Sequence, residues 1–568
     1  MGEVQTTEDI RERWLSVWEE AVGLWSPYVQ LRQPLLCRTE KEAAKEGLSS
    51  SFAMIRLTDY SVVVSLEQVK KLGLENFPME ILAHEAGHHV YCPADLTDLG
   101  RVIGRIQNAI PGYEQHASLI ANLYEDILIN NHLFSEFHLK MDKVYEKVKG
   151  GSKDKLWNFY MRTYEVLWAL PAQTLTEEQV DTETEGDAIL ASRVVRNFSR
   201  EWIRGSGEFA SICYRYLLES GVPQNKFNIW LDSINPGDGK TIPAGLSGMD
   251  EDEAGTGALP GELRKAASEP SSDQGKGSKG NYREPYQYGQ ILRAMGIDLT
   301  EQEIAARYYR ERAIPYLIKF PSVEMPESEE PLPEGLKEWD AGDSFESLSL
   351  FDSLLKSPVM IPGYTTVERI SGSSKGKEPA SEPIDLDIYI DSSGSMPNPS
   401  VNTSYLTLAG AVICLSALRS GSKVQATLWS GTNQFIKTDG FVRNEKEIMG
   451  ILTGFFGGAT AFPIHVMRET YLSRKPGSRK VHILVISDDG VTTMFDKDEK
   501  GNSGKDIAAA SLKNCGGGGT FALNIYGMNK ELEAAQKMGW GIYPVTDWEE
   551  LMKFSRDFVK KHYGRERK

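Results

Sequence analysis

Hydrophobic residues in the first part of the chain recur with the period of an α-helix. Residues 7–30 place Ile10, Trp14 and Trp18 on one helical face, a pattern typical of core packing. A second helical run covers residues 114–134, and further helical patterns follow it. The sequence therefore predicts a mainly helical first part.

The hydrophobic pattern changes from Ile384 onward. Short apolar segments such as IDLDIYID (384–391) and KVHILVISD (480–488) alternate with segments of helical spacing. Strands that are continuously apolar and separated by helices indicate a parallel sheet that helices cover on both faces. We predict a doubly wound, Rossmann-like α/β fold for this part of a multidomain chain.

Two polar stretches separate these parts. Between about residues 235 and 281 the composition turns to Gly, Ser, Pro and charged residues, which bury too little apolar surface to become ordered. After a helical piece at 286–320, residues 324–346 hold nine acidic side chains and one lysine, which favours a solvated connector over a docking segment. The predicted divisions are an N-terminal domain (1–234), a flexible linker (235–282), a helical and acidic connector (283–382) and a C-terminal domain (383–568).

Length, composition and charge narrow the class of protein. The 568 residues are 40% hydrophobic, which is enough to bury the cores of several domains. The formal net charge of −17 makes nucleic acid a poor partner, because a phosphate backbone attracts clustered Lys and Arg. The five cysteines form no CxxC pair, and we find no signal peptide or membrane span in the sequence. We expect a soluble cytoplasmic protein that does not associate with membranes.

The clearest chemical motif is HEAGH at residues 84–88, which fits HExxH and lies in a helical pattern after a β-rich stretch. His84 and His88 share one face of a helix at the spacing that a zinc ion requires. Glu85 could then take a proton from a metal-bound water, which makes a hydroxide for amide hydrolysis.

A catalytic zinc needs a third protein ligand and leaves its fourth position to water. The helical segment 122–130 carries two acids among apolar positions, where a carboxylate is costly unless it is paired or binds a metal. Glu125 is the first choice and Asp126 its rival, and the acid that does not bind zinc could accept a hydrogen bond from a ligand histidine. Cys92 is a weaker candidate, because Pro93 ends the helix there. The alternatives are an ordinary helix with clustered histidines or a zinc site without catalysis.

The C-terminal domain carries a second candidate metal site. Its first strand ends in DSSGS (391–395), a DxSxS arrangement in a loop that leads to a helix. Such loops lie at the carboxyl edge of the sheet, where open α/β folds bind ligands, and carboxylate and hydroxyl oxygens suit Mg²⁺. The GGAT loop (457–460) and the acids after a later strand would converge there. The candidate ligands are Asp391, Ser393, Ser395, Thr460 and either Asp488 or Asp489. The alternative is a Ser/Gly turn that binds no metal.

The strand, the HExxH helix and the later acidic helix resemble a zincin-type metallopeptidase domain over roughly residues 50–135. The chain departs from the commonest gluzincin pattern, in which Asp follows the ligand Glu by four residues, because here Asn122 stands four before Asp126. This resemblance implies a mainly α, α+β domain. The implied zinc ligands are His84, His88 and either Glu125 or Asp126, and the implied general base is Glu85.

Residues 383–555 resemble a von Willebrand factor A domain, because the DxSxS loop, the Thr loop and the later Asp occur in the order of that family's metal-ion-dependent adhesion site. The resemblance implies that Asp391, Ser393, Ser395, Thr460 and Asp488 surround a Mg²⁺ ion. A chain that joins this domain to a zincin-like one is similar to bacterial and phage proteins that work beside MoxR-type AAA+ ATPases. In that family the metal site recruits a carboxylate of a partner protein.

Three functions follow as hypotheses. The first is a zinc metallopeptidase whose C-terminal domain recruits an AAA+ ATPase or a protein substrate. The second is a non-catalytic adaptor or scaffold in such an ATPase complex, and the third is a subunit of a metal chelatase. The intact HExxH favours the first, because neither a scaffold nor a chelatase subunit would need Glu85 as a base.

Overall fold

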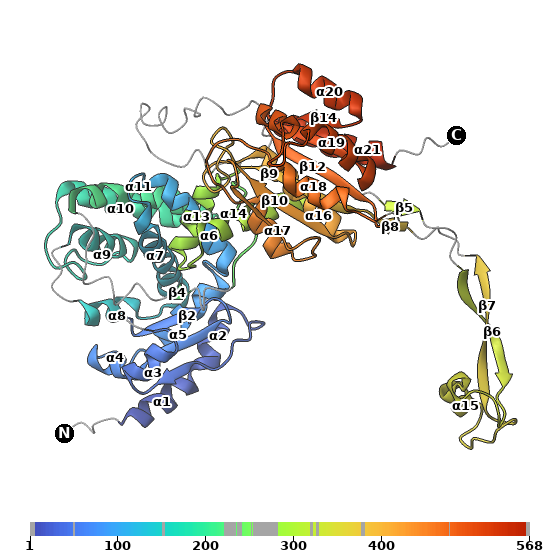
Figure 1. Ribbon diagram of the computed structural model, residues 1–568. Coiled ribbons are helices and arrows are strands. Elements are labelled where there is room, and N and C mark those ends of the chain that lie inside the picture. Colours follow the sequence, from blue (N-terminus) through green and yellow to red (C-terminus); the bar gives the residue numbers. More distant parts are fainter. Residues whose placement is uncertain are drawn as a thin grey trace.

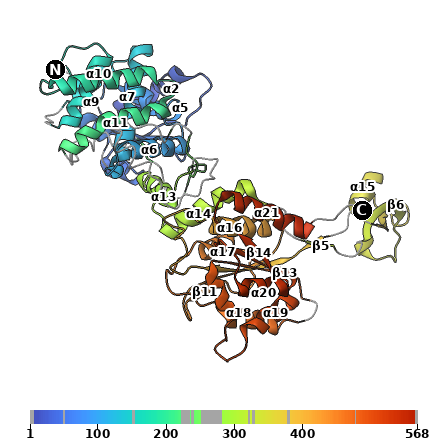
Figure 2. The same ribbon diagram turned by 90° about the horizontal axis from the view of Figure 1, so that it is seen from above.

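The structure is a computed structural model of the chain and describes residues 6–48, 51–149, 154–220, 234–235, 241–250, 253, 282–318, 322–324, 329–375, 381–475 and 478–563. They form a mainly helical N-terminal domain, a C-terminal domain built on a six-stranded sheet, and a small projecting arm (Figures 1 and 2). This multidomain organisation agrees with the coarse fold class predicted from the sequence. None of the helices in these ranges is long and apolar enough to cross a membrane.

The N-terminal domain combines helices with a small sheet. Its strands lie in the order β1 (Leu35–Cys37), β3 (Ser61–Ser65), β2 (Ala53–Arg56) and β4 (Ile234–Asn235), and only β2 and β3 are antiparallel neighbours. Its helices are α1 (Thr7–Ser16), α2 (Trp18–Trp25), α3 (Glu40–Lys45), α4 (Leu66–Lys71), α5 (Pro78–Val90), α6 (Leu96–Ala109), α7 (Ala117–Phe137), α8 (Met141–Val148), α9 (Lys155–Leu167), α10 (Thr182–Asn197) and α11 (Trp202–Ser220). The HExxH motif is on α5 and the acidic candidates are on α7.

Helix α5 packs against α2, α7 and strand β2. Pro78 stands in its first turn, where the missing amide proton costs no hydrogen bond. Gly87 permits a close approach to both neighbouring helices, because a Cβ atom there would lie 2.6 Å from Trp25 Cζ2 and 2.8 Å from Ile129 Cγ2. The Trp25 indole also donates a hydrogen bond to the carbonyl oxygen of Ala83 at 2.7 Å. These contacts fix the orientation of the HExxH helix relative to α7.

The C-terminal domain has strands in the order β11-β10-β9-β12-β13-β14, all parallel except the edge strand β11. The strands are β9 (Asp385–Asp391), β10 (Val424–Trp429), β11 (Phe435–Lys437), β12 (Val481–Ser487), β13 (Gly516–Leu523) and β14 (Gly541–Pro544). The chain starts in the centre at β9, reaches one edge, and returns to the centre at β12. The carboxyl ends of β9 and β12 therefore border the crevice where an open α/β sheet binds ligands.

Helices cover both faces of this sheet. The face of Ile388 and Ile390 shares a core with α16, α17 and α21, and the face of Tyr389 and Val485 shares another with α18, α19 and α20. This explains why the strands read as continuously apolar. The helices are α16 (Tyr405–Arg419), α17 (Glu445–Leu452), α18 (Ile464–Leu472), α19 (Gly504–Cys515), α20 (Lys530–Met538) and α21 (Trp548–Tyr563).

Helices α13 (Pro285–Ala294) and α14 (Glu301–Ala313) connect the two domains. Helix α13 packs against α6, and α14 packs against α16 and α17. The Ser118 hydroxyl donates to the carbonyl oxygen of Ala294 at 2.5 Å, and the Ser404 amide donates to the Tyr309 hydroxyl at 2.7 Å. The helical piece predicted at 286–320 is therefore a packed bridge.

Residues 241–250, which lie within the predicted flexible linker, pack against α6. Leu246 is fully buried, and a Cβ atom on Gly100 would lie 2.7 Å from its side chain. The Arg105 guanidinium pairs with Asp250 at 3.0 Å. Arg283 also donates to the carbonyl oxygens of Leu246 and Gly248, so a buried leucine and buried polar contacts hold this segment although its average composition is polar. Most of the remaining linker lies outside the described residues.

The predicted acidic connector contains strands that the sequence did not suggest. Strand β5 (Ser322–Glu324) pairs with β8 (Ser381–Pro383), and β6 (Glu329–Glu338) pairs with β7 (Val367–Lys375), both antiparallel. A seven-residue helix, α15 (Leu350–Lys356), packs against β7. Acidic residues and two prolines interrupt the alternation of β6, which explains why it was read as a connector. We call residues 329–375 the arm, because they project from the rest of the chain (Figure 1).

Candidate metal centres

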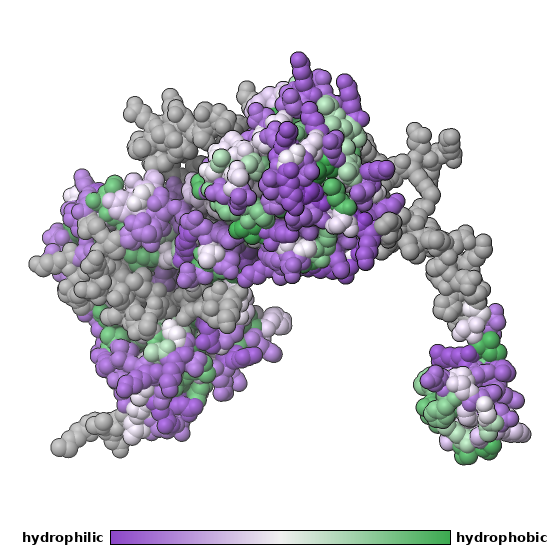
Figure 3. Space-filling model, viewed as in Figure 1, coloured by the Kyte–Doolittle hydropathy of each residue, from purple (hydrophilic) through white to green (hydrophobic). Residues whose placement is uncertain are grey.

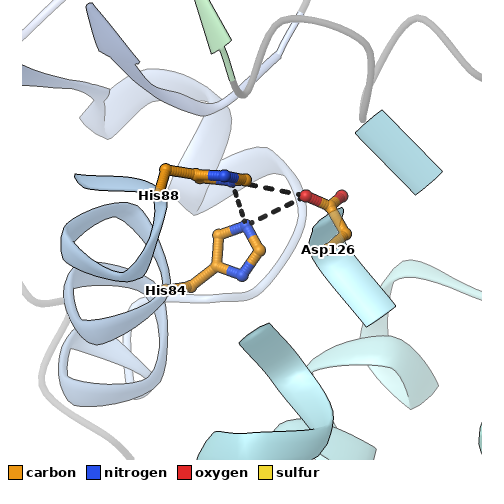
Figure 4. A group of neighbouring side chains, drawn as sticks. All are labelled: His84, His88 and Asp126. Carbon is orange, nitrogen blue, oxygen red and sulfur yellow. Dashed lines mark hydrogen bonds and ion pairs between the residues drawn. The ribbon is translucent and has the colours of Figure 1, made fainter. Parts of the chain in front are cut away.

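Three side chains from α5 and α7 converge in the N-terminal domain. Nε2 of His88 lies 3.2 Å from Nε2 of His84. Oδ1 of Asp126 lies 3.5 Å from Nε2 of His84 and 3.4 Å from Nε2 of His88. Figure 4 shows the two rings and the carboxylate pointing toward one centre. Among the described residues, this is the one group of at least three His, Cys, Asp or Glu side chains close enough to hold a metal ion.

The dimensions of this triangle fit zinc. Ligand atoms at 2.0–2.1 Å from a tetrahedral zinc lie about 3.3–3.4 Å from one another, which agrees with the three measured separations. Oδ1 of Asp126 is buried and, apart from the two imidazoles, has no hydrogen-bond donor among the described residues, as expected for an oxygen that faces a cation. Two imidazoles and one carboxylate are also a ligand set typical of catalytic zinc sites.

The structure brings Asp126, and not Glu125, to the histidines. Consecutive helical residues point about 100° apart, so Glu125 faces another part of the core. Its two carboxylate oxygens are buried without a hydrogen-bond partner in the described part of the chain, and burial raises its pKa well above the usual range. Of the two acids that the sequence offered as the third ligand, the rival Asp126 is therefore the one beside the histidines, and zinc binding itself stays a prediction.

Cys92 does not take a ligand position in this group either. Its thiol lies 3.7 Å from the backbone oxygen of Glu125. Its own carbonyl oxygen is 3.2 Å from Nδ1 of His88. Because a carbonyl only accepts hydrogen bonds, Nδ1 carries the proton and Nε2 keeps the lone pair that a metal needs.

Asn130 orients His84 in the way that the Cys92 carbonyl orients His88. Its Oδ1 atom accepts a hydrogen bond from Nδ1 of His84 at 2.7 Å, and its Nδ2 atom donates to the hydroxyls of Tyr145 and Tyr164 at 2.8 and 2.9 Å. The sequence predicted this role for whichever of Glu125 and Asp126 does not bind zinc, and not for Asn130. The signal for Asn130 was present, because it follows Asp126 by four residues on the same face of α7.

Burial and charge act against each other in this site. Burial disfavours the charged imidazolium of His84, but the hydrogen bond and charge of Asp126 outweigh it and raise the pKa of His84 to about 9. Burial likewise opposes ionisation of Asp126, but hydrogen bonds and charges from both histidines lower its pKa overall. A negative Asp126 therefore makes this corner of the core attractive to a cation.

Glu85 lies beside the triangle and outside it. It borders a pocket together with His84, Asp126, Asn130 and Tyr145, and the remaining wall is mostly apolar. Burial, with a smaller contribution from the charge of Asp126, raises the pKa of Glu85 to about 8. A carboxyl group whose pKa is raised toward neutrality can exchange a proton near neutral pH.

The second group forms at the crevice between β9 and β12. Oδ1 of Asp391 accepts from the Ser393 amide at 2.8 Å, and Oδ2 accepts from the Ser487 hydroxyl at 2.5 Å. The hydroxyl oxygens of Ser393 and Ser395 are 3.1 Å apart. Burial raises the pKa of Asp391, although these hydrogen bonds partly oppose it. Ser487 was not among the predicted residues, and its signal is a polar residue at the end of a buried apolar strand.

The loops that were expected to converge on this group do approach it. The Gly394 amide donates to the carbonyl oxygen of Gly458 at 2.8 Å, which joins the DxSxS loop to the GGAT loop. A Cβ atom on Gly490 would lie 2.5 Å from Thr460 Cγ2 and 2.9 Å from Oδ1 of Asp488. These two residues are therefore neighbours, and glycine is the residue that leaves room for both.

The structure also separates the two candidate acids after β12. Asp488 is buried, and its Oδ1 accepts a hydrogen bond from the Gly490 amide at 2.8 Å. Its negative charge acts on Asp391 and contributes to the raised pKa of that carboxyl. Asp489 is exposed and begins the short helix Asp489–Phe495. Of the two, Asp488 is the one placed with the DxSxS loop.

Comparisons with known proteins add little to this picture. No protein-family model matches the chain, and no curated protein is similar to it. Among solved structures, a conserved hypothetical protein, BatB from Bacteroides thetaiotaomicron, aligns at 17% sequence identity over 32% of this chain and 98% of that chain, with a TM-score of 0.21. A TM-score this low supports no inference about this chain.

Proposed function

We propose that the protein is a zinc-dependent peptidase. The observation that carries this proposal is the triangle of His84, His88 and Asp126, with separations of 3.2, 3.4 and 3.5 Å, beside the carboxyl group of Glu85. A zinc ion that only stabilises a scaffold would need the three ligands and no further acidic group. A titratable acid in the same pocket is the additional group that hydrolysis requires.

Each residue then has a defined role. His84, His88 and Asp126 would hold zinc, while Asn130 and the Cys92 carbonyl fix the two imidazoles. Zinc would supply a Lewis acid that polarises the peptide carbonyl and acidifies water. Glu85 accepts the proton from the attacking water and returns it to the leaving amine, so no proton is gained or lost over the cycle.

For the C-terminal domain we propose a von Willebrand factor A fold with a Mg²⁺ site. Asp391, Ser393, Ser395, Thr460 and Asp488 would surround the ion. Support comes from the hydroxyl and carboxylate oxygens at the crevice and from the joined DxSxS and GGAT loops. A MoxR-type AAA+ ATPase or a protein substrate would donate the carboxylate that completes the coordination shell.

The experiment for the peptidase compares Glu85→Gln with Glu125→Gln. Both replace a buried carboxyl by an amide of the same shape, but only Glu85 borders the pocket. Zinc content is measured by elemental analysis, and hydrolysis is followed with fluorescein-labelled casein. We expect zinc in both variants and a loss of hydrolysis of about 10²-fold or more in Glu85→Gln alone. Equal hydrolysis in wild type and Glu85→Gln would favour a non-catalytic adaptor.

The experiment for the Mg²⁺ site measures binding of the candidate ATPase to the full chain. It is run with Mg²⁺, with EDTA, and with Asp391→Ala, which removes the only charged ligand of the DxSxS loop. We expect binding in the first condition only. Binding that is the same in all three conditions would exclude the ion as the docking point.

A further inference from the structure

The arm exposes an unusual amount of apolar surface for a small element. Phe351 and Leu355 of α15 are 67% and 72% exposed. Their helix places them four residues apart, next to a second exposed pair, Leu350 and Leu354. Phe345, five residues before α15 in the sequence, is also exposed. Figure 3 shows green, hydrophobic side chains gathered around the end of the arm.

The arm has too small a core to explain these side chains. Within residues 334–372, the fully described part of the arm, only Trp339, Ser353, Thr366 and Val367 are buried. Leucine and phenylalanine side chains exposed together at helical spacing are typical of a helix that enters a groove of another protein.

The apolar surface is held in one conformation before any partner binds. The Thr365 hydroxyl donates to the carbonyl oxygen of Val359 at 2.7 Å and accepts from the Ile361 amide at 2.7 Å. The amide of Val367 donates to the Ser353 hydroxyl at 2.9 Å, which attaches α15 to β7. An ordered surface loses less conformational entropy on binding.

Charge identifies the kind of partner. Residues 334–372 carry seven acidic and three basic side chains. All three basic side chains pair with acids of the arm itself, namely Lys337 with Glu368, Arg369 with Asp352 and Lys356 with Glu338. The exposed acids Asp340, Asp343 and Glu346 take part in none of these ion pairs, although the charge of Asp343 also acts on Lys337. The surroundings of the apolar surface are therefore negative.

We propose that the arm docks α15 into an apolar groove, bordered by Lys and Arg, on a separate protein. A second copy of the chain is the less favourable occupant, because two acidic arms on chains of net charge −17 repel each other. An anionic membrane surface is disfavoured for the same reason. This contact is separate from both metal centres and does not depend on the proposed peptidase or Mg²⁺ site.

The test uses the full chain with a photo-crosslinking residue at position 355, exposed to extract from the source cells in the presence of EDTA. The crosslinked protein is identified and purified, and its affinity is measured for wild type, for Phe351→Ser/Leu355→Ser, and for Asp340→Lys/Glu346→Lys. Leu472→Ser is the matched control, because Leu472 is a 47% exposed leucine on α18. The substituted arm residues are exposed, so thermal melts should not change.

We expect the apolar double variant to weaken binding at least ~10-fold. The charge variant should weaken it at low salt and remove most of its salt dependence, and the control should bind as wild type. Unchanged affinity of Phe351→Ser/Leu355→Ser would overturn the proposal. Dimerisation of the wild-type chain that this variant abolishes would also overturn the proposal. Arm-dependent binding to phosphatidylserine vesicles would overturn it as well. Loss of binding in EDTA would assign the contact to the metal sites and would also overturn it.

Discussion

Asn130 joins His84 to a buried cluster of tyrosines. Its oxygen accepts from Nδ1 of His84 at 2.7 Å, and its amide nitrogen donates to Tyr145 and Tyr164, whose hydroxyls lie 3.0 Å apart. The amide is thereby fixed in one orientation, since its oxygen and nitrogen have different partners. A ligand histidine held in this way presents Nε2 to the metal without rearrangement.

Asn130→Ala should therefore weaken zinc binding about 10–100-fold without abolishing it. The histidine keeps its position on α5 but loses the acceptor that selects its tautomer. Affinity is measured by competition with a coloured chelator. Tyr160→Phe is the control, because that hydroxyl hydrogen-bonds the tyrosines of the cluster, and no hydrogen bond joins it to Asn130 among the described residues. An Asn130→Ala affinity equal to that of Tyr160→Phe would show that the amide does not position His84.

The identity of the third ligand is tested by a pair of neighbouring substitutions. Asp126→Asn should empty the zinc site, because an amide replaces the negative oxygen that lies 3.4–3.5 Å from both histidines. Glu125→Gln should keep zinc, because this buried side chain lies outside the group. Elemental analysis of the two purified proteins gives the answer, and the reverse result would restore Glu125 as the ligand.

The sequence predicted the HExxH helix well, because spacing along one helix determines which side chains share a face. It could not choose between Glu125 and Asp126, because that choice depends on how α7 is rotated against α5. Gly87 and its contacts with Trp25 and Ile129 set that packing, and they are distant in the sequence. The stripe formed by Asn122, Asp126 and Asn130 at every fourth position was the available clue.

The parallel sheet of the C-terminal domain was easier to predict than the choice between Glu125 and Asp126. Continuous apolar strands indicate a covered parallel sheet wherever they occur, and the carboxyl ends of such strands meet at one edge. Ser487 was missed because a small polar residue at a strand end has many uses. The strands of the arm were missed because acidic residues and two prolines obscure the alternation of Glu329–Glu338.

Ser487→Ala should weaken Mg²⁺ binding while leaving the fold intact. The Ser487 hydroxyl donates to Oδ2 of Asp391 at 2.5 Å, and this hydrogen bond stabilises the ionised carboxyl in a buried position. Without it, Asp391 is less ionised and less well oriented. Mg²⁺ affinity is measured by titration calorimetry. Ser511→Ala removes a buried hydroxyl without a hydrogen-bond partner in the described structure, and equal effects of the two substitutions would contradict this role.

Asp387 should make the stability of the chain depend on pH. It is buried in β9, where it accepts hydrogen bonds from the Tyr471 hydroxyl at 2.8 Å and the Gln425 amide at 3.2 Å. Burial outweighs these hydrogen bonds and raises the pKa of Asp387 from 3.8 to about 6. Between those values the folded chain binds a proton that the unfolded chain has released.

The contribution of Asp387 to stability is therefore greatest below about pH 4, falls as the pH rises to about 6, and is constant above that. The total loss is on the order of 3 kcal/mol, from about two pKa units. Asp387→Asn removes this dependence, because the amide remains neutral and keeps an oxygen for one of the two donors. Thermal melts at pH 4.5 and 7.5 should show a larger gain in Tm over wild type at the higher pH. The control is Asp439→Asn, which changes an exposed acid and should show no such difference between the two pH values. Parallel pH profiles of wild type and Asp387→Asn would mean that Asp387 of the folded chain is ionised over this whole pH range.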